Sequence, residues 1–209
     1  LFQHTLLKWY TKHGRDFPWR KEKASNYEII IAELLLQRTR AETVADYFHT
    51  FINRFSSWED LAEAGENDIA ICLRPIGLWR RRSASLAALS REMVRRNGEF
   101  PKERENIEAL PGIGQYIANA ILLFCHQDAQ PLLDANMARV LERVFGPRQL
   151  KDIRYDPYLQ RLSREIIRCK NPVKMNWAIL DLAGTICRFN SPRCNMCPIR
   201  PICLQYCLL

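Results

Sequence analysis

The sequence predicts an all-α fold, and three observations carry that prediction. Segments with helical periodicity fill most of the chain, the alternation typical of strands is nearly absent, and glycine and proline interrupt the helical segments at short intervals. Of the 209 residues, 47% are hydrophobic and 26% are charged. This composition is ordinary for globular proteins and is enough for one or two compact cores.

The expected helices follow one another through short connections. Gly14 closes the first helix, Gly77 precedes a long basic helix, and Gly146 ends the helix that follows residue 134, because glycine readily leaves helical geometry. In chain order we expect helices at residues 1–13, 27–39, 41–55, 58–63, 67–73, 79–97, 104–109, 115–126, 135–145, 157–169 and 174–185.

One expected helix is chemically unusual. In YEIIIAELLLQRT, residues 27–39, apolar side chains cover nearly the whole circumference, so the helix should be buried. Glu33 lies in its middle, and Gln37 follows four residues later on the same face. A buried carboxylate is costly unless it is paired, protonated or lines a wet cavity. A structural pairing with an arginine and a pocket carboxylate suited to acid–base chemistry are both open.

The charge balance points to a polyanionic partner. Basic residues outnumber acidic ones by 31 to 23, giving a formal net charge of +8, and residues 187–209 contain no acidic side chain. Nucleic acid is the first partner to consider, and a basic protein without such a partner is the alternative. No apolar run approaches the roughly 18 residues of a membrane helix, and the first residues lack a signal-peptide pattern. We expect an intracellular protein.

Disulfides are a poor explanation for the eight cysteines of an intracellular chain. Four thiolates within a short segment can surround one metal centre, which would supply the cohesion that such a segment lacks. Zinc and an iron–sulfur cluster both use four cysteines, and the spacing alone does not separate them. We take Cys207 as a non-ligand. The four expected ligands read Cys187-x6-Cys194-x2-Cys197-x5-Cys203.

A glycine-rich turn precedes the helix expected at 115–126. In Leu110-Pro111-Gly112-Ile113-Gly114, both glycines can take positive φ and leave the backbone uncovered, so amide groups can approach a phosphate. The helix that starts at about Gln115 adds its positive N-terminal dipole. Such contacts hold a protein on DNA without reading its sequence.

Together these features resemble the endonuclease III and MutY superfamily of helix–hairpin–helix DNA glycosylases. The cysteine spacing matches its [4Fe–4S] loop, the glycine turn matches its hairpin, and Asp134, about 20 residues beyond the turn in LLDANMARVLERVFG, matches its aspartate. The resemblance runs from RDFPWR at 15–20 to the last expected cysteine ligand. It implies a [4Fe–4S] cluster on the four cysteines, and a monovalent cation at the hairpin.

The same resemblance implies an architecture. It divides the chain into a central six-helix subdomain at 25–130, with the helix–hairpin–helix at about 104–126, and a second subdomain formed by 1–24 and 131–209. The second subdomain would carry the iron–sulfur loop at 187–203, and DNA and the base pocket would lie in the cleft between the two.

The resemblance also implies roles in breaking the N-glycosidic bond of a flipped nucleotide. Asp134 would face the sugar, stabilise its positive charge and orient or deprotonate water, and its place before ANMARVLERVF also suits a helix N-cap.

Bifunctional members carry a lysine where this chain has Tyr116, and a phenol cannot form their imine, so hydrolysis to an abasic site is expected. Tyrosine there, DAN at 134–136 and AELLLQRT at 32–39 are typical of Mig-type thymine–guanine mismatch glycosylases. Glu33 would then line the base pocket.

DNA contacts follow from the same resemblance. The basic run at 80–82 would suit phosphates, and we expect contacts from Gln37, Arg38, Leu78, Arg80, Leu110, Gly112, Ile113, Gly114 and Gln115. The preferred function is a monomeric, DNA-associated, monofunctional glycosylase that removes thymine or uracil opposite guanine from double-stranded DNA, in base excision repair of deaminated bases. The alternatives are a MutY-like adenine glycosylase, acting opposite guanine or oxidised guanine, and a non-catalytic DNA-binding module.

Overall fold

The computed structural model describes residues 1–207, which form helices and short 3₁₀ turns and no strand, as predicted. The longer helices are α1 (Phe2–His13), α2 (Asn26–Leu36), α3 (Ala41–Arg54), α4 (Trp58–Leu73), α5 (Trp79–Arg95), α7 (Gln115–Cys125), α8 (Ala135–Phe145), α9 (Pro157–Ile167) and α10 (Pro172–Thr185). The short ones are α6 (Arg104–Glu108), α11 (Leu204–Cys207), η1 (Pro18–Arg20), η2 (Arg74–Ile76), η3 (Cys194–Met196) and η4 (Arg200–Ile202).

Two expected helices differ most from the structure, and the ends of several others shift by one or two residues. The helices expected at 58–63 and 67–73 are the two arms of α4, which bends at Gly65, where φ is 70°. The helix expected at 27–39 ends at Leu36, because Gln37 turns out of helical geometry with ψ of 111°. Gln37 is exposed while Glu33 is buried, so the two side chains do not continue one helical face.

The chain divides into two compact units. One is continuous, Asp16–His126, and the other combines Leu1–Arg15 with the chain from Gln127 onward. The boundaries of the subdomains expected from sequence are 24/25 and 130/131. The boundaries between the two units lie nearby, at Arg15/Asp16 and at His126/Gln127.

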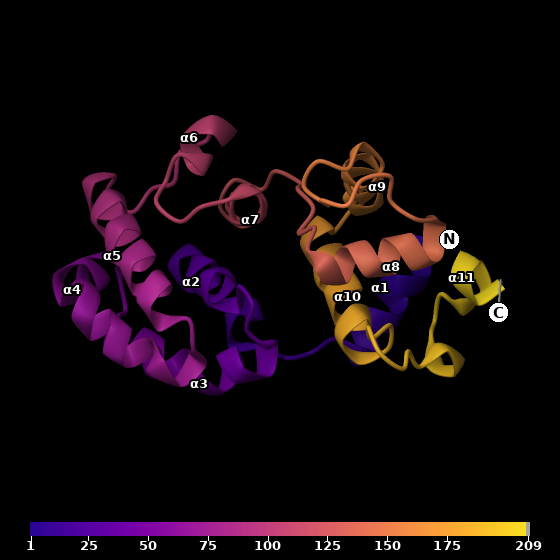
Figure 1. The fold of residues 1–209 in the computed structure, drawn as a ribbon, viewed down its shortest axis with the longest axis horizontal. Coiled ribbons are helices and arrows are strands. Elements are labelled where there is room, and N and C mark those ends of the chain that lie inside the picture. Colours follow the sequence, from indigo (N-terminus) through magenta and orange to yellow (C-terminus); the bar gives the residue numbers. More distant parts are fainter. Residues whose placement is uncertain (208–209) are drawn as a thin grey trace. The chain divides into compact units, whose positions relative to one another are not determined.

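The continuous unit is built around α2. Ser25 caps this helix by accepting the Glu28 amide while the Glu28 side chain accepts the Ser25 amide, a complete capping box. Seven of its residues are buried, as the apolar sequence predicts, and it packs against α3 and α7. Within the same unit α4 packs along α5 (Figure 1).

The unit formed from both ends of the chain is built around α10, which packs against α1, α8 and α9. Asp181 of α10 is fully buried and accepts the backbone amide and the Nε of Arg15, each at 2.8 Å. Asn176 of α10 accepts the Leu132 amide at 2.7 Å and donates to the Gln130 carbonyl at 3.1 Å. These bonds fix the extended segment that leads into Asp134. Across residues 1–207, no helix has the length and apolarity needed to cross a membrane.

Candidate active site

Glu33 and Tyr116 meet inside the continuous unit. Glu33 lies in the middle of α2 and is only 3% exposed, and Tyr116 is the half-buried second residue of α7. The Tyr116 hydroxyl donates to Oε2 of Glu33 at 3.0 Å. Two residues 83 positions apart, both expected in the base pocket, are therefore hydrogen-bonded partners.

Asp134 is the N-cap of α8, as its sequence context predicts. Its Oδ1 accepts the backbone amides of Asn136 (2.9 Å) and Met137 (2.8 Å), and its Oδ2 accepts the Asn136 side-chain amide at 2.8 Å. The carboxylate is therefore held in one orientation. Burial raises the pKa of Asp134 above its ordinary value, and the bonds from Met137 and Asn136 oppose that rise.

A further set of hydrogen bonds leads from Asp134 to residues 187–203, here called the cysteine segment. Asn136 Oδ1 accepts Nη1 of Arg139 at 3.1 Å, and Nε of the same arginine donates to the Cys187 carbonyl at 2.9 Å. A third bond runs from Nη2 of Arg139 to the Ala183 carbonyl at 3.0 Å. Sequence reasoning missed Arg139, because its place on α8 marks it only as one of many basic residues.

The cysteine segment folds around a cavity of about 50 Å³ that is lined by Cys187, Cys194, Cys197 and Cys203. Burial raises the pKa of Cys197 to about 11, and the other three thiols add to that rise. Among residues 1–207, no three His, Cys, Asp or Glu side chains are grouped closely enough to hold a metal ion. Cys207 is exposed on α11 and is absent from the cavity lining.

Arg143 of α8 ties this segment to the rest of its unit. Its Nη1 donates to the Arg188 carbonyl at 2.8 Å and lies 3.4 Å from the Cys187 sulfur, and its Nη2 donates to the Phe189 carbonyl at 3.2 Å. Arg143 also lines the thiol cavity. Sequence reasoning did not single out this arginine either, since its partners lie more than 40 residues away.

The glycine turn at 110–114 joins α6 to α7. Gly112 has φ of 75°, but Gly114 is extended at −109°, so only the first glycine needs positive φ. A Cβ on Gly112 would also lie 2.9 Å from the Cβ of Ser85. Both glycines are exposed, whereas Leu110 and Ile113 are buried, so the turn presents backbone outward and anchors itself with apolar side chains. Helix α7 starts at Gln115, as expected, and has no side-chain cap.

Two short segments of the continuous unit present the other expected DNA contacts, Gln37, Arg38 and Leu78, as exposed residues. The exit segment of α2, residues 37–39, contains Gln37 and Arg38, and Arg38 has φ of 57°. The wedge segment, residues 76–78, contains Leu78, which is 52% exposed with φ of 54°. Non-glycine residues at positive φ cost roughly 1–3 kcal/mol each, and such strain gathers at functional sites.

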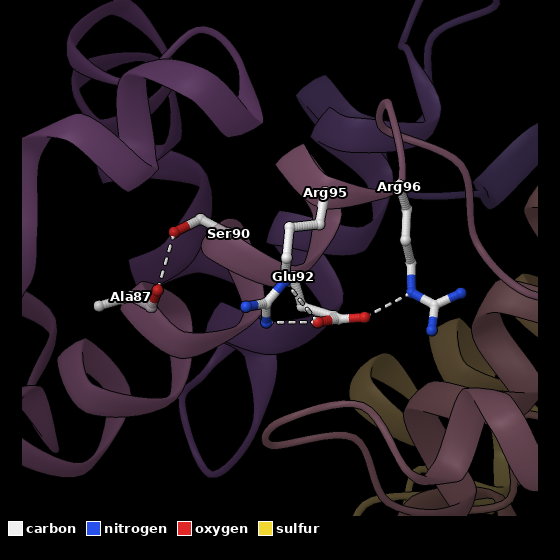
Figure 2. Close-up of polar contacts among 5 residues, drawn as sticks. All are labelled: Ala87, Ser90, Glu92, Arg95 and Arg96. Atoms are coloured by element: carbon white, nitrogen blue, oxygen red, sulfur yellow. Dashed lines mark hydrogen bonds and ion pairs between the residues drawn. The ribbon is translucent and has the colours of Figure 1, made fainter.

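The arginines of α5 and its C-cap differ in whether their charge is exposed to solvent, buried or paired with a carboxylate. Arg80 is exposed and lies 4.8 Å from the Trp79 ring centroid, but Arg82 is buried, so the expectation that the whole 80–82 run faces phosphate is wrong. Figure 2 shows Glu92 between the two arginines near the end of the helix. Its carboxylate accepts Nε of Arg95 at 3.0 Å and Nε of Arg96 at 2.7 Å. These partners lower the pKa of Glu92 and compensate part of the positive charge.

The family model for HhH-GPD superfamily base excision DNA repair proteins matches residues 31–164. The chain belongs to the HhH-GPD superfamily. The matched region includes Glu33, Tyr116, Asp134 and the glycine turn, and it ends before the cysteine segment.

Other members of the HhH-GPD superfamily match almost the whole chain. A thymine/uracil-DNA glycosylase of Pyrobaculum aerophilum is 36% identical over 98% of this chain and 91% of its own length. A thymine-DNA glycosylase of Aeropyrum pernix is also 36% identical, over 96% and 92%. The solved structure of a thermostable thymine-DNA glycosylase superposes with a TM-score of 0.90 at 29% identity, covering 100% of this chain and 96% of that one.

Proposed function

We propose that this protein is a monofunctional DNA glycosylase that hydrolytically removes thymine or uracil opposite guanine and leaves an abasic site. The names of its 36% identical relatives and of its structural neighbour support the substrate class. The observation that carries the hydrolytic reaction is the hydrogen bond from Tyr116 to Glu33, at the position where bifunctional members carry a lysine. A phenol held by a buried carboxylate offers no amine for an imine.

Asp134 is proposed as the catalytic carboxylate. Cleavage of the N-glycosidic bond leaves positive charge on the deoxyribose and negative charge on the departing base. A carboxylate that is already oriented stabilises that cation without having to reorganise. The three hydrogen bonds from Asn136 and Met137 supply the orientation, and they leave the carboxylate free to attract or deprotonate a water molecule at its remaining lone pairs.

Glu33 and Tyr116 are proposed as the wall that meets the flipped pyrimidine. The base must leave the helical stack before its sugar can be reached. A buried carboxylate is a strong acceptor for the N3–H of thymine or uracil, and an aromatic ring beside it offers a stacking surface. The Tyr116 hydroxyl fixes the carboxylate through Oε2 at 3.0 Å.

The DNA backbone is proposed to bind at the glycine turn and along the basic side chains near it. The uncapped N-terminus of α7, with Gly112, Gly114 and Gln115, offers amides and a positive dipole to one phosphate. Arg80 would add an exposed cation. Gln37 with Arg38 would enter the hole left by the flipped base, and Leu78 would press between bases of the opposite strand. One set of these groups per chain supports action as a monomer.

The cysteine segment is proposed to hold a [4Fe–4S] cluster. Two observations support this proposal: all four thiols of the 6-2-5 spacing line one cavity, and Arg143, which also lines it, can compensate thiolate charge. The bound cluster would supply cohesion to a segment that has only two short 3₁₀ turns. Arg188, Arg193 and Arg200 would then face the DNA backbone. No catalytic step is assigned to the cluster.

A duplex panel tests the function directly. Labelled duplexes holding T·G, U·G, A·G, or A opposite oxidised guanine are incubated with the protein and then treated with alkali. Scission of the T or U strand that depends on alkali is expected. Scission of the A strands alone would identify an adenine glycosylase, and scission without alkali would overturn the hydrolytic mechanism. A protein that binds all duplexes and cleaves none would be the non-catalytic module.

A further inference from the structure

The side chain of Arg82 lies in the interior of the continuous unit. Arg82 stands in the first turn of α5 and is only 9% exposed, beside two arginines that face solvent. Burial lowers its pKa below the ordinary value. A guanidinium group is buried only where acceptors replace water, so the acceptors around Arg82 define what it does.

One nitrogen of this guanidinium group holds the wedge segment. Nη1 of Arg82 donates to the Gly77 carbonyl at 2.9 Å and to the Ile76 carbonyl at 3.3 Å. Gly77 itself has φ of 76°. The two carbonyls are thus fixed from the inside, directly before Leu78, which is 52% exposed.

The second terminal nitrogen of Arg82, Nη2, holds the end of α2 and the exit segment. Nη2 of Arg82 donates to the Leu35 carbonyl at 3.0 Å, to the Gln37 carbonyl and to the Thr39 hydroxyl at 2.7 Å. Carbonyls at the C-terminus of a helix have no partner within the helix. Arg82 satisfies them, and the chain can leave helical geometry at Gln37 and reach Arg38 with positive φ.

We propose that Arg82 is a positioning residue for base extrusion. It holds the exit segment and the wedge segment at one separation, so that Gln37, Arg38 and Leu78 enter the DNA together. This inference rests on the proposed glycosylase function. The two segments begin 39 positions apart in the sequence, at residues 37 and 76, and one planar guanidinium group joins them.

Lysine cannot replace arginine in this role. A guanidinium group presents donors in a rigid plane and reaches acceptors on two sides, whereas an ammonium group is a point charge. Arg82→Lys keeps the charge and loses the bridge, and Arg82→Met removes both. Arg91→Met on the same helix removes an exposed positive charge and serves as the matched control.

The test compares two uracil duplexes in single-turnover reactions. One has uracil opposite guanine, and the other has uracil opposite an abasic site, where no partner base must be separated. We expect Arg82→Met and Arg82→Lys to lower the rate on U·G relative to the abasic duplex by up to roughly 100-fold, because a misplacement of about 1 Å can cost that much rate. The fluorescence of a 2-aminopurine placed beside the uracil rises when the neighbouring base leaves the stack. This rise should be lost to the same degree in the two Arg82 variants. Arg91→Met should leave the ratio of rates unchanged.

Hydrogen exchange tests the positioning independently of activity. Amides of residues 37–40 and 76–79 should exchange faster in the Arg82 variants than in Arg91→Met. An equal loss of rate on both duplexes, an unchanged ratio, or unchanged exchange in these segments would overturn the proposal. Wild-type protein inactive on every duplex would instead reject the proposed function, and the exchange result would still decide the role of Arg82. If Arg82→Met does not fold, Arg82→Lys carries both measurements.

Discussion

Asp134 combines two tasks in one side chain. As the N-cap of α8 it accepts two backbone amides, and as the proposed catalytic group it must remain an anion next to a developing cation. The two tasks agree in geometry, since a capping carboxylate points in one direction. They conflict in energy, because burial raises the pKa of Asp134 and so disfavours the form that catalysis needs.

Asp134→Asn separates these tasks. An asparagine caps a helix about as well as an aspartate, but it cannot stabilise a cation as an anion does. We expect the single-turnover rate on U·G to fall by about 10²–10⁴-fold, with unchanged or tighter DNA binding because a negative charge near phosphate is removed. Rapid-quench kinetics and fluorescence anisotropy measure the two quantities. A variant with near-normal turnover would remove Asp134 from the mechanism.

The raised pKa of Asp134 predicts how stability and rate depend on pH. The folded carboxyl binds its proton more tightly than the unfolded one, so this contribution to stability is complete below the ordinary value of 3.8 and is lost as pH rises through the folded value. At neutral pH, Asp134→Asn should therefore unfold at a slightly higher temperature than wild type. The wild-type rate should rise with pH through the folded value, and a rate independent of pH across the acid range would contradict this.

Tyr116→Lys tests the link from tyrosine to hydrolysis. A neutral lysine amine near Glu33 could attack C1′ of the sugar and displace the base. Opening of the C1′–O4′ bond, with transfer of an amine proton to O4′, would then give an imine, which borohydride traps as a covalent protein–DNA adduct. We expect some trapped adduct and alkali-independent scission in the variant and none in wild type. Tyr116→Phe is the control, since it also loses the hydrogen bond to Glu33 but offers no amine. Trapping by wild type would show that another amine performs the lyase reaction.

At the scale of elements, the cysteine segment, residues 187–203, is where the proposed cluster would contribute most. It contains only η3 and η4 between α10 and α11, and its anchors to α8 are the hydrogen bonds of Arg139 and Arg143. A segment with so little regular structure gains folding free energy from a bound metal centre, and the proposed cluster would have this effect here.

Cys197→Ser should disrupt this segment. We expect loss of iron and of visible absorbance, faster proteolysis after residue 187, and a melting temperature lower by several degrees. Cys207→Ser is the matched control and should change none of these, because Cys207 is exposed and outside the cavity lining. Iron analysis and limited proteolysis measure the outcome. If the wild-type protein is colourless and contains zinc, the cysteine segment holds a zinc site and the proposal of a cluster is wrong.

Helix positions were predictable to within one or two residues where glycine, proline or a cap marks the end. The helix expected at 135–145 has those bounds, because Asp134 starts it and Gly146 ends it. The end of α2 was not predictable. Nothing in LLLQRT stops a helix at Leu36, and the side chain that donates to the Leu35 and Gln37 carbonyls there, Arg82, lies 45 residues beyond Gln37 in the sequence.

The site was predictable in its residue types and not in its contacts. Glu33 is conspicuous as a charge in an apolar helix, and its burial follows from that pattern. Its hydrogen bond to Tyr116 depends on how α2 and α7 pack, which local periodicity does not contain. The same holds for Arg139 and Arg143, whose surface-like sequence context hides long-range backbone partners.

Over the whole molecule, the net charge of +8 predicts DNA affinity that falls steeply with salt. With Asp134→Asn as the inactive background, Arg80→Met should lower the slope of log affinity against log salt by about one phosphate contact. Arg95→Met should change the slope less, since Arg95 is compensated by Glu92. Anisotropy titrations at several salt concentrations measure the slopes. Equal changes would show that the Glu92 pairing does not persist on DNA.

The unit formed from both ends of the chain cannot complete its core until late in synthesis. Helix α1 leaves the ribosome well before α10, because the aspartate that receives Arg15 lies 166 residues after it in the chain. At 5–20 residues per second, this delay is roughly 10–30 s. The stretch from Asp16 to His126 can complete its own core in that time. Phe2 packs against Phe145 of α8 in the finished protein, and α1 as a whole packs against α10. Phe2 and Leu6, both buried in the finished protein, are therefore available to chaperones until α8 and α10 have been made.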